Sequence, residues 1–407
     1  MRVLLISWEY PPVVQGGLGR HVHKLSEQLA ADGVELHVLT RGADADADRG
    51  CDSPVPGTAP VEEVLGDVRV HRVREPPFTQ NLEVFLGWVA GMNRDLRALG
   101  EELCAASRFD LVHSHDWLVA DAAGGIARAA AIPWLVTVHA TEFGRHQGWV
   151  DEHPQSDIHA SERAMALHAD RLITCSDYMR LHVAEVFGVP LSRITAIPNG
   201  IDQRDLEPVE GDLSAVRARY ARPSERLVLM VGRLMFEKGF HLALDALAAI
   251  VAGRRDVRFV IAGSGMAEGE LRRQAQRLRL TEHGSFLGPV PEKLLQSLYR
   301  VADVCVVPSL YEPFGLVALE AMVSGCVCVV AGTGGLREIV PGDGSVGLRF
   351  AAGDSDALRV TLERVLSDDL LRARLVARAR EYVARFNWIE VARQTREVYD
   401  ALAVAAT

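Results

Sequence analysis

Two carboxylates, Glu312 and Glu320, stand eight residues apart in a segment whose hydrophobic pattern changes from strand to helix. A continuous apolar run ends at Val307, and apolar residues at helical spacing follow over Gly315–Ser324. We therefore expect a buried strand, a loop carrying Glu312, and a helix with Glu320 about one turn inside it. The N–H groups at the start of that helix form a positive site for an anion. Amides for a phosphate and carboxylates for hydroxyl groups together suit a phosphorylated sugar.

Two basic residues, Arg233 and Lys238, flank a second predicted strand-to-helix loop, Gly232–Gly239. They supply two positive charges without a metal ion, and a departing diphosphate needs such charge while its bond breaks. Each charge-assisted contact is worth about 1.5–3 kcal/mol. The alternative is that both residues are ordinary surface cations, but the presence of Glu312 in the same half of the chain favours a phosphate site.

Three further motifs follow predicted strands in the first half of the chain, and ligands of open parallel sheets bind at the carboxyl ends of strands. Glu9 and the turn Gly16–Gly19 follow the first strand. The glycines either let the backbone approach a ligand or simply open a helix. Asp116 follows the strand at Asp110–His113, and His139 ends a very apolar strand. The sequence leaves open whether Asp116 and His139 have only a packing role or contact a ligand.

Metal ligands are not predicted. His21 and His23 share a helix, but no third ligand at metal spacing accompanies them, so we expect both on the helix surface. The Asp-x-Asp pairs of Ala43–Pro60 fall in a polar segment that is typical of a solvated loop. Gly263 and Gly265 follow a strand but lack the rest of a dinucleotide fingerprint, so we interpret them as a packing turn.

Composition narrows the class of protein. The 407 residues are 48% hydrophobic and 24% charged, which is typical of a globular chain with two domains. A net charge of −10 argues against a nucleic-acid binder, which would show a basic field. No apolar run approaches the roughly 18 residues of a membrane span, so no stable membrane insertion is expected. The six cysteines form no CxxC pair, and unpaired cysteines fit a reducing cytoplasm.

Short apolar strands alternate with amphipathic helices throughout, which predicts an α/β fold with two doubly wound parallel sheets. We expect an N-terminal Rossmann-like domain over residues 1–200, a C-terminal one over 201–385, and a last helix over 386–407 that packs back on the N-terminal domain. A hinge is predicted at Pro198–Asp202. If the two sheets face each other, the motifs above line one cleft. The predicted strands are Val3–Ser7, Val34–Thr40, Asp110–His113, Trp134–His139, Arg171–Cys175, Leu227–Val231, Val257–Ala262, Cys305–Val307 and Val327–Ala331.

Together these motifs resemble the retaining glycosyltransferases of family 4, which adopt the GT-B fold of two Rossmann-like domains facing across a cleft. The most specific parts of the resemblance are Gly232-Arg233-x4-Lys238-Gly239 and Glu312-x7-Glu320. The segments Ser7–Pro12 and His139–Trp149 look like those of the glycogen-synthase-like actinobacterial α-glucosyltransferases. The resemblance implies glucose transfer from a nucleotide diphosphate glucose (ADP-glucose or UDP-glucose). The implied acceptor is an α-glucan, a maltooligosaccharide or glucose 1-phosphate.

The roles known in the family, placed on matching positions here, imply a site in several parts. Arg233 and Lys238 would hold the donor diphosphate. Glu312 would contact the transferred sugar, and Glu320 would contact the nucleotide ribose. His139 would hydrogen-bond the sugar near the reacting carbon. The remaining implied positions are Phe314, Gly315, Leu316 and Val317 for sugar hydroxyls and phosphate, Gly16 and Gly17 for the diphosphate, and Glu9 and Asp116 for the acceptor. No cofactor and no metal are implied.

One position departs from the resemblance. Bacterial glycogen synthases carry a lysine just before the Gly-Gly turn, where this chain has Gln15, so a preference for ADP-glucose does not follow. Two rival functions stay open: a nucleotide-sugar 2-epimerase of the same architecture, and a family 4 transferase with a different sugar or lipid acceptor. A sugar-binding protein without catalytic activity is disfavoured, because Arg233, Lys238 and both carboxylates are all present. The nucleotide base, the acceptor and the oligomeric state stay open.

Overall fold

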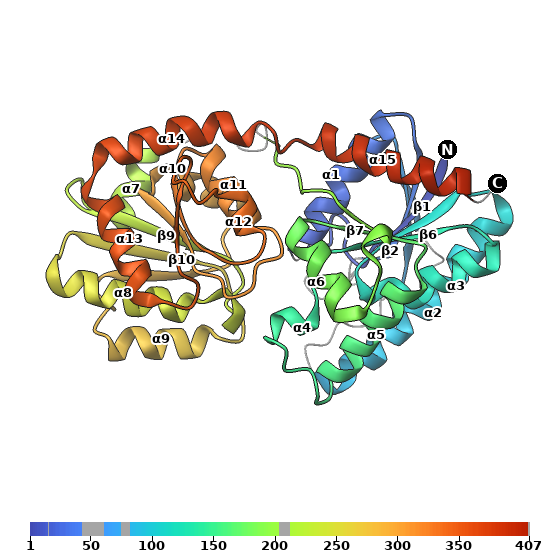
Figure 1. Cartoon of the computed structure of the whole chain (residues 1–407), viewed down its shortest axis with the longest axis horizontal. Coiled ribbons are helices and arrows are strands. Elements are labelled where there is room, and N and C mark those ends of the chain that lie inside the picture. The colour runs from blue at the N-terminus through green and yellow to red at the C-terminus, as the bar shows by residue number, and fades with distance from the viewer. Residues whose placement is uncertain (15, 43–60, 75–81, 203–211, 406–407) are drawn as a thin grey trace, which may run out of the picture. The chain divides into compact units, whose positions relative to one another are not determined.

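Two compact units make up the chain in the computed structural model, which describes residues 1–14, 16–42, 61–74, 82–202 and 212–405. The first unit contains Met1–Gly200 together with Trp388–Thr407, and the second contains Ile201–Asn387 (Figure 1). Gln15 and the predicted loop Ala43–Pro60 lie outside the described residues. Within the described ranges, no helix is both long enough and apolar enough to cross a membrane.

The first unit is built on an eight-stranded sheet with the order β3-β4-β2-β1-β5-β6-β7-β8. Neighbouring strands pair in parallel except β3 and β4, which are antiparallel. Continuous buried runs such as Val3–Ile6 are expected where helices cover both faces of a parallel sheet. The strands are β1 (Arg2–Ile6), β2 (Glu35–Arg41), β3 (Val61–Leu65), β4 (Val68–Val73), β5 (Leu111–His115), β6 (Trp134–Val138), β7 (Arg171–Thr174) and β8 (Ile194–Ala196).

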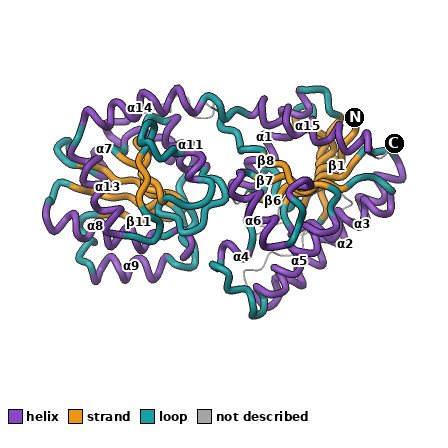
Figure 2. The backbone as a smooth tube through the Cα atoms, viewed as in Figure 1, coloured by secondary structure: helices purple, strands orange, loops and turns teal. Residues whose placement is uncertain are grey.

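Helices lie on both faces of this sheet (Figure 2). In α1 the residues Val22, Leu25 and Leu29 fall on one side at helical spacing and are buried in the core with β1 and β2. The helices are α1 (Gly17–Ala31), α2 (Leu82–Ala106), α3 (Ala120–Ala130), α4 (Glu142–Arg145), α5 (Gln155–His168), α6 (Asp177–Phe187) and α15 (Trp388–Ala405), with short 3-10 turns at Trp117–Val119 and Leu191–Arg193.

The second unit has a six-stranded parallel sheet with the order β11-β10-β9-β12-β13-β14. Counted from its first strand this is 3-2-1-4-5-6, the order of dinucleotide-binding folds. The strands are β9 (Arg226–Val231), β10 (Val257–Ala262), β11 (Gly284–Gly288), β12 (Val304–Val307), β13 (Val327–Ala331) and β14 (Leu348–Phe350). The helices are α7 (Leu213–Tyr220), α8 (Phe240–Gly253), α9 (Glu268–Arg277), α10 (Glu292–Val301), α11 (Leu316–Val323), α12 (Leu336–Ile339), α13 (Ser355–Ser367) and α14 (Asp369–Val383), with a 3-10 turn at Phe236–Lys238.

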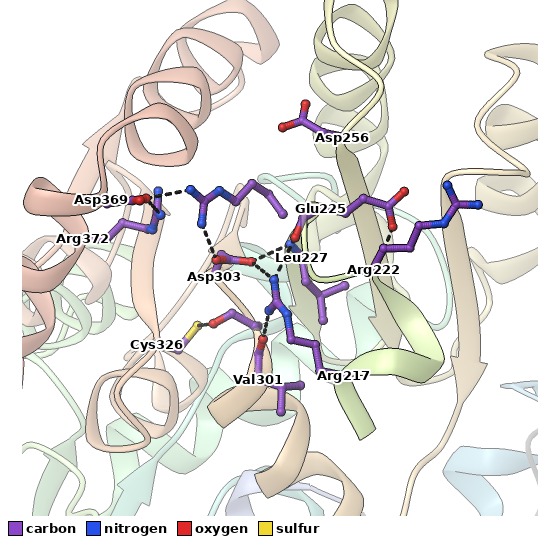
Figure 3. Close-up of polar contacts among 12 residues, drawn as sticks. Arg217, Arg222, Glu225, Leu227, Asp256, Val301, Asp303, Cys326, Asp369 and Arg372 are labelled. Carbon is purple, nitrogen blue, oxygen red and sulfur yellow. Dashed lines mark hydrogen bonds and ion pairs between the residues drawn. The ribbon is translucent and has the colours of Figure 1, made fainter. Parts of the chain in front are cut away.

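A polar network holds the amino ends of the two central strands of the second sheet together (Figure 3). Asp303 accepts the backbone N–H of Leu227 at 2.8 Å and forms ion pairs with Arg217 at 2.8 Å and Arg226 at 3.3 Å. Arg217 also donates to the carbonyl of Val301. Because Leu227 lies in β9 and Asp303 directly precedes β12, the network fixes the two strands between which the strand order reverses.

The last helix, α15, packs on the first unit beside α1 (Figure 1). The hydroxyl of Tyr399 hydrogen-bonds the buried Nδ1 of His113 at 2.7 Å, and Arg396 forms an ion pair with Asp32 at 3.1 Å. The ring of Trp388 lies so close to the backbone of Gly200 that a Cβ there would stand 2.7 Å from it. The end of the chain therefore completes the core of the unit in which the chain begins.

Every strand predicted from the sequence is present, with ends displaced by at most two residues. Five strands of the described chain, namely β3, β4, β8, β11 and β14, were not predicted. β8 and β14 have three residues each, and β11 contains two glycines, so none gives a clear periodic signal. In β3 and β4, charged residues interrupt the apolar run that marks a buried parallel strand.

The prediction that His21 lies on the surface of α1 is wrong. Its side chain is 5% exposed, because it faces the rings of Trp388 and His139 at centroid distances of 5.3 and 4.7 Å. His23 is half-buried, and its Nε2 lies 3.4 Å from Glu27. The difference arises from α15, which covers α1 from a distant part of the sequence.

Candidate functional site

Each sheet has one point at which the strand order reverses, between β1 and β5 in the first unit and between β9 and β12 in the second. Loops that leave the carboxyl ends of such strands diverge and open a place for a ligand. The predicted site residues follow these strands or their neighbour β6. Glu9, Gly16 and Gly17 follow β1, Asp116 follows β5, His139 follows β6, Arg233 and Lys238 follow β9, and Glu312 to Glu320 follow β12.

The loops after β9 and β12 touch each other through their backbones. The N–H of Leu310 donates to the carbonyl of Glu237 at 2.8 Å. Gly239 has φ +67°, and a Cβ at this position would stand 2.0 Å from the carbonyl oxygen of Pro308. Glycine is therefore required at position 239, and the close approach sets Lys238 beside the loop that contains Glu312.

Lys238 and Glu312 form an ion pair between these two loops. Lys238 Nζ lies 2.9 Å from Glu312 Oε2, and the hydroxyl of Ser309 donates to the same oxygen at 3.0 Å. The side chains are 20% and 13% exposed, so most of each is shielded while part still faces solvent. The structure thus brings together a cation and a carboxylate that are 74 residues apart in the sequence.

Arg233 occupies the other end of the same loop. Its side chain is 57% exposed, and Nη2 lies 3.9 Å from the buried Glu237. Below the loop, a Cβ at Gly263 would stand 1.9 Å from the carbonyl oxygen of Gly232, and one at Gly265 would stand 2.3 Å from that of Leu234. The interpretation of Gly263 and Gly265 as a packing turn is confirmed, since they support the backbone on either side of Arg233.

Helix α11 begins at Leu316, as the sequence predicted to within one residue, and Gly315 precedes it with φ +116°. A Cβ at Gly315 would stand 2.5 Å from Leu336, so both the dihedral angle and the space require glycine. The first N–H groups of a helix have no partner within it, so those of Leu316 and Val317 are available for an anion. Phe314 is buried immediately before them.

Glu320 lies inside α11 and is 5% exposed. The hydroxyl of Tyr299, from α10, donates to its Oε2 at 2.8 Å. The buried hydrogen bond fixes the carboxylate on the side of α11 that faces α10, one turn after the helix start.

In the first unit, Glu9 holds the turn that opens α1. Its side chain is 3% exposed, and its Oε2 accepts the N–H of Gly16 at 3.2 Å. A Cβ at Gly19 would stand 2.7 Å from the same oxygen, whereas a Cβ at Gly16 would meet no described atom within 4 Å. The glycines therefore differ in role: Gly19 makes room for Glu9, and Gly16 borders open space next to Gly17, the first residue of α1.

Asp116 connects the ends of β5 and β6. It has φ +59°, unusual for a residue with a side chain, and its Oδ1 accepts the N–H of His139 at 2.7 Å. Burial raises the pKa of Asp116 to about 6, although the hydrogen bond from His139 and the charge of Arg145 oppose the rise. Asp116 therefore fixes the backbone at His139 and is mostly ionised at neutral pH.

His139, which is partly exposed, lies against the buried His115 and His21, a grouping that the sequence did not predict. Its Nε2 lies 3.0 Å from His115 Nδ1, and the ring of His21 packs edge-on against it. Burial lowers the pKa of His139 to about 4 and lowers that of His21 and His115 well below the ordinary range. All three are neutral at pH 7 and could bind a metal ion through one nitrogen each. The available signal was that His115 and His139 both fall at or just after the carboxyl ends of predicted strands.

Trp149 is the most exposed large aromatic residue of the described chain, at 80%. The turn before it is well fixed, because Gly148 donates to the carbonyl of Phe143 at 2.8 Å and Trp149 donates to that of His146 at 2.9 Å. Gln147 and Gly148 both have positive φ, at +54° and +91°. The indole is thus held outward on an ordered turn that follows α4.

Comparison with known proteins agrees with this geometry. The profile of Glycosyltransferase Family 4 matches residues 15–205, and that of Glycosyl transferases group 1 matches residues 215–382. The chain is 39% identical to the glycogen synthase of Mycobacterium tuberculosis over 98% of its own length and 94% of the relative's. The chain belongs to the family 4 glycosyltransferases.

This glycosyltransferase is also similar to a D-inositol 3-phosphate glycosyltransferase of Frankia alni, at 34% identity over 96% of each chain. Among solved structures it resembles the sucrose-phosphate synthase of Thermosynechococcus elongatus, with a TM-score of 0.79 and 26% identity over 99% of each chain. The predicted α/β fold of the GT-B class with two Rossmann-like units is confirmed.

Replacing Asp116 by Asn tests the buried charge. Because folding raises the pKa of this carboxyl from 3.8 to about 6, the native state binds its proton more tightly than the unfolded state. The contribution of Asp116 to stability should therefore fall between about pH 4 and pH 6, by about 3 kcal/mol in total. Asn keeps an acceptor for the N–H of His139 but cannot ionise.

Denaturant unfolding of wild type and Asp116→Asn at several pH values measures this difference, with the exposed Asp121→Asn as the control. Asp116→Asn should gain stability relative to wild type as pH rises through the window. Parallel curves for wild type and Asp116→Asn would show that the carboxyl has an ordinary pKa.

Proposed function

We propose that this glycosyltransferase is a retaining α-glucosyltransferase. It moves glucose from ADP-glucose or UDP-glucose to the 4-hydroxyl of an α-1,4-glucan, or to a glucose phosphate. The main support from the structure is the contact of Lys238 with Glu312 beside the start of α11, which gathers positive charge, amides and a carboxylate at one point. Identity of 39% to a protein named glycogen synthase supports the choice of glucan and glucose.

The second unit binds the donor in this proposal. Arg233 and Lys238 neutralise the diphosphate, and the N–H groups from Phe314 to Val317 donate to phosphate and sugar oxygens. Glu312, oriented by Lys238 and Ser309, accepts hydrogen bonds from hydroxyl groups of the sugar. Glu320 contacts the ribose of the nucleotide.

The first unit provides the remaining groups. His139, neutral at pH 7, hydrogen-bonds the sugar near the reacting carbon. Gly16 and Gly17 border the diphosphate, and the open space at Gly16 is consistent with a ligand there. Glu9 and Asp116 contribute to binding of the acceptor, either by direct contact or through the backbone segments that they fix.

The reaction breaks the bond between the anomeric carbon and the diphosphate oxygen and forms a bond from that carbon to the acceptor oxygen on the same face. The leaving phosphate oxygen takes the acceptor's proton, so no enzyme nucleophile is needed. Retaining glycosidases instead use two carboxylates about 5–5.5 Å apart. Here Glu312 is paired with Lys238, and Glu320 with Tyr299, which supports electrostatic rather than nucleophilic roles. The transfer itself requires no metal or other cofactor.

The cell compartment is proposed to be the cytoplasm. Cys104, Cys175, Cys305, Cys326 and Cys328 are unpaired thiols in the described chain, and four of these five are buried. Unpaired cysteines are typical of a reducing compartment.

A second candidate is a family 4 transferase acting on another acceptor, favoured by the 34% identity to a D-inositol 3-phosphate glycosyltransferase. An epimerase of the same architecture would act on the donor alone. These candidates differ in what must be added to the donor before a product forms.

Arg233→Ala and Lys238→Ala should each lower kcat/KM by 100-fold or more, because each removes a contact of about 2–3 kcal/mol to the leaving diphosphate. Initial rates and calorimetric binding of the nucleoside diphosphate measure the effect. Arg233→Ala is the cleaner variant, since its side chain is largely exposed. Lys293→Ala, an exposed lysine of α10, is the control and should behave as wild type. Wild-type turnover in the two site variants would refute the assignment.

Trp149 offers an apolar platform for a sugar ring of a glucan acceptor. Trp149→Ala should raise KM for glycogen by about tenfold, equivalent to about 1.4 kcal/mol, and leave the rate with glucose 1-phosphate nearly unchanged. Trp149→Phe should recover part of the loss. Leu370→Ala, which removes an exposed apolar side chain in the second unit, is the control. Equal losses with both acceptors would show that Trp149 acts on folding or donor binding instead.

A donor and acceptor panel tests the function itself. ADP-, UDP- and GDP-glucose are each incubated with glycogen, maltose, glucose 1-phosphate, D-inositol 3-phosphate or no acceptor, with and without chelator. We expect transfer to a glucan or glucose phosphate, unaffected by chelator, with retained α-configuration. Intact mass spectrometry after donor alone should show no glycosyl adduct. Epimerised sugar without acceptor, a strict Mn²⁺ requirement or a covalent adduct would each contradict part of the proposal.

A further inference from the structure

Three histidines from different elements of the first unit converge beneath the carboxyl ends of its strands. His21 comes from α1, His115 ends β5 and His139 follows β6, and one ligand nitrogen from each lies within 4.8 Å of the other two. His115 Nδ1 and His139 Nε2 are 3.0 Å apart. Nitrogens bound to one tetrahedral Zn²⁺ at about 2.0–2.1 Å stand at a similar separation, and the nitrogen of His21, within 4.8 Å of both, would have to approach them to complete the set.

Two ring nitrogens of this trio lack hydrogen-bond partners. His21 Nδ1 and His115 Nε2 are buried, and neither has a partner among the described residues. Buried polar atoms are normally paired, so unpaired ones call for an explanation such as an ion. His21 also has a side-chain hydrogen bond with Asn199, and its ring packs against that of His115 at a centroid distance of 5.6 Å. The trio therefore has capacity to bind that its own hydrogen bonds do not use.

The chemistry of the trio selects the kind of ion. Three imidazoles without a carboxylate ligand suit Zn²⁺, Cu²⁺ or Ni²⁺ rather than Mg²⁺ or Ca²⁺, which prefer oxygen. Asp116 is not among the described residues whose ligand atoms converge here, and its Oδ1 accepts the N–H of His139. His21 and His115 are buried, whereas His139 keeps part of its surface exposed and is the member of the trio nearest to solvent.

We propose that His21, His115 and His139 form a site for a borderline transition-metal ion, with Zn²⁺ as the favoured occupant, and that the ion inhibits the enzyme. Bound metal would take the lone pair of His139 and hold its ring toward the other two histidines. A sugar that needs the ring of His139 in another orientation, or the ring nitrogen that faces His115, would then compete with the ion. The inhibition rests on the proposed function of His139, whereas the metal site itself does not.

Binding is tested on the chelator-treated full chain by titration with Co²⁺, whose visible absorption intensifies in a tetrahedral site, followed by displacement with Zn²⁺. We expect one ion per chain, and X-ray absorption of the Zn²⁺ form should show three imidazole ligands. His21→Asn should weaken binding at least tenfold. His23→Asn changes a histidine two residues further along the same helix, on a different side, and should bind as wild type. Circular dichroism checks that the variants fold.

Absence of a stoichiometric ion in the wild type would overturn the metal site, whatever the behaviour of the variants. Binding that persists unchanged in a folded His21→Asn would place the ion elsewhere and overturn it equally. For inhibition, Zn²⁺ should raise the apparent KM for the nucleotide sugar, chelator should reverse the effect, and His21→Asn should require at least tenfold more Zn²⁺. An enzyme that binds Zn²⁺ at the trio but turns over normally would refute the inhibition and the sugar contact of His139, leaving the metal site intact.

Discussion

The contact between Lys238 and Glu312 is the interaction on which the candidate donor site depends. It joins the loop after β9 to the loop after β12 at 2.9 Å, and Ser309 fixes the same carboxylate oxygen. Both loops leave strands on either side of the reversal in strand order, where a parallel sheet opens. An uncompensated pair of carboxylates at this place would repel a diphosphate. The lysine, the exposed Arg233 and the first amides of α11 make the same place attractive to one.

Glycines determine how closely the parts of this site approach. Gly239 lies against the carbonyl of Pro308, and Gly315 admits the side chain of Leu336 where α11 begins. In the first unit, Gly19 makes space for the carboxylate of Glu9, which in turn accepts the N–H of Gly16. The polar network of Asp303 joins β9 and β12 at their amino ends, opposite the loops. The two strands from which the loops leave are therefore fixed relative to each other.

Local patterns were enough to predict nine of the fourteen strands of the described chain, the start of α11, and the position of Lys238 and Glu312 after two of those strands, because each depends on a short run of sequence. The same patterns placed His21 on a surface. Its burial depends on Trp388, which is 367 residues away, as well as on His139, and no periodicity within α1 contains that information. The hydrogen bond between Tyr399 and His113 is of the same kind. Strands β8 and β14 were not predicted, because three residues are too few to show a periodic hydrophobic pattern.

A crystal structure of the enzyme with a nucleoside diphosphate tests the central claim most directly. The account predicts that the diphosphate lies within hydrogen-bond distance of Lys238 Nζ and the N–H groups of Leu316 and Val317, with Arg233 turned toward it. A well-ordered nucleotide bound away from the ends of β9 and β12 would contradict it.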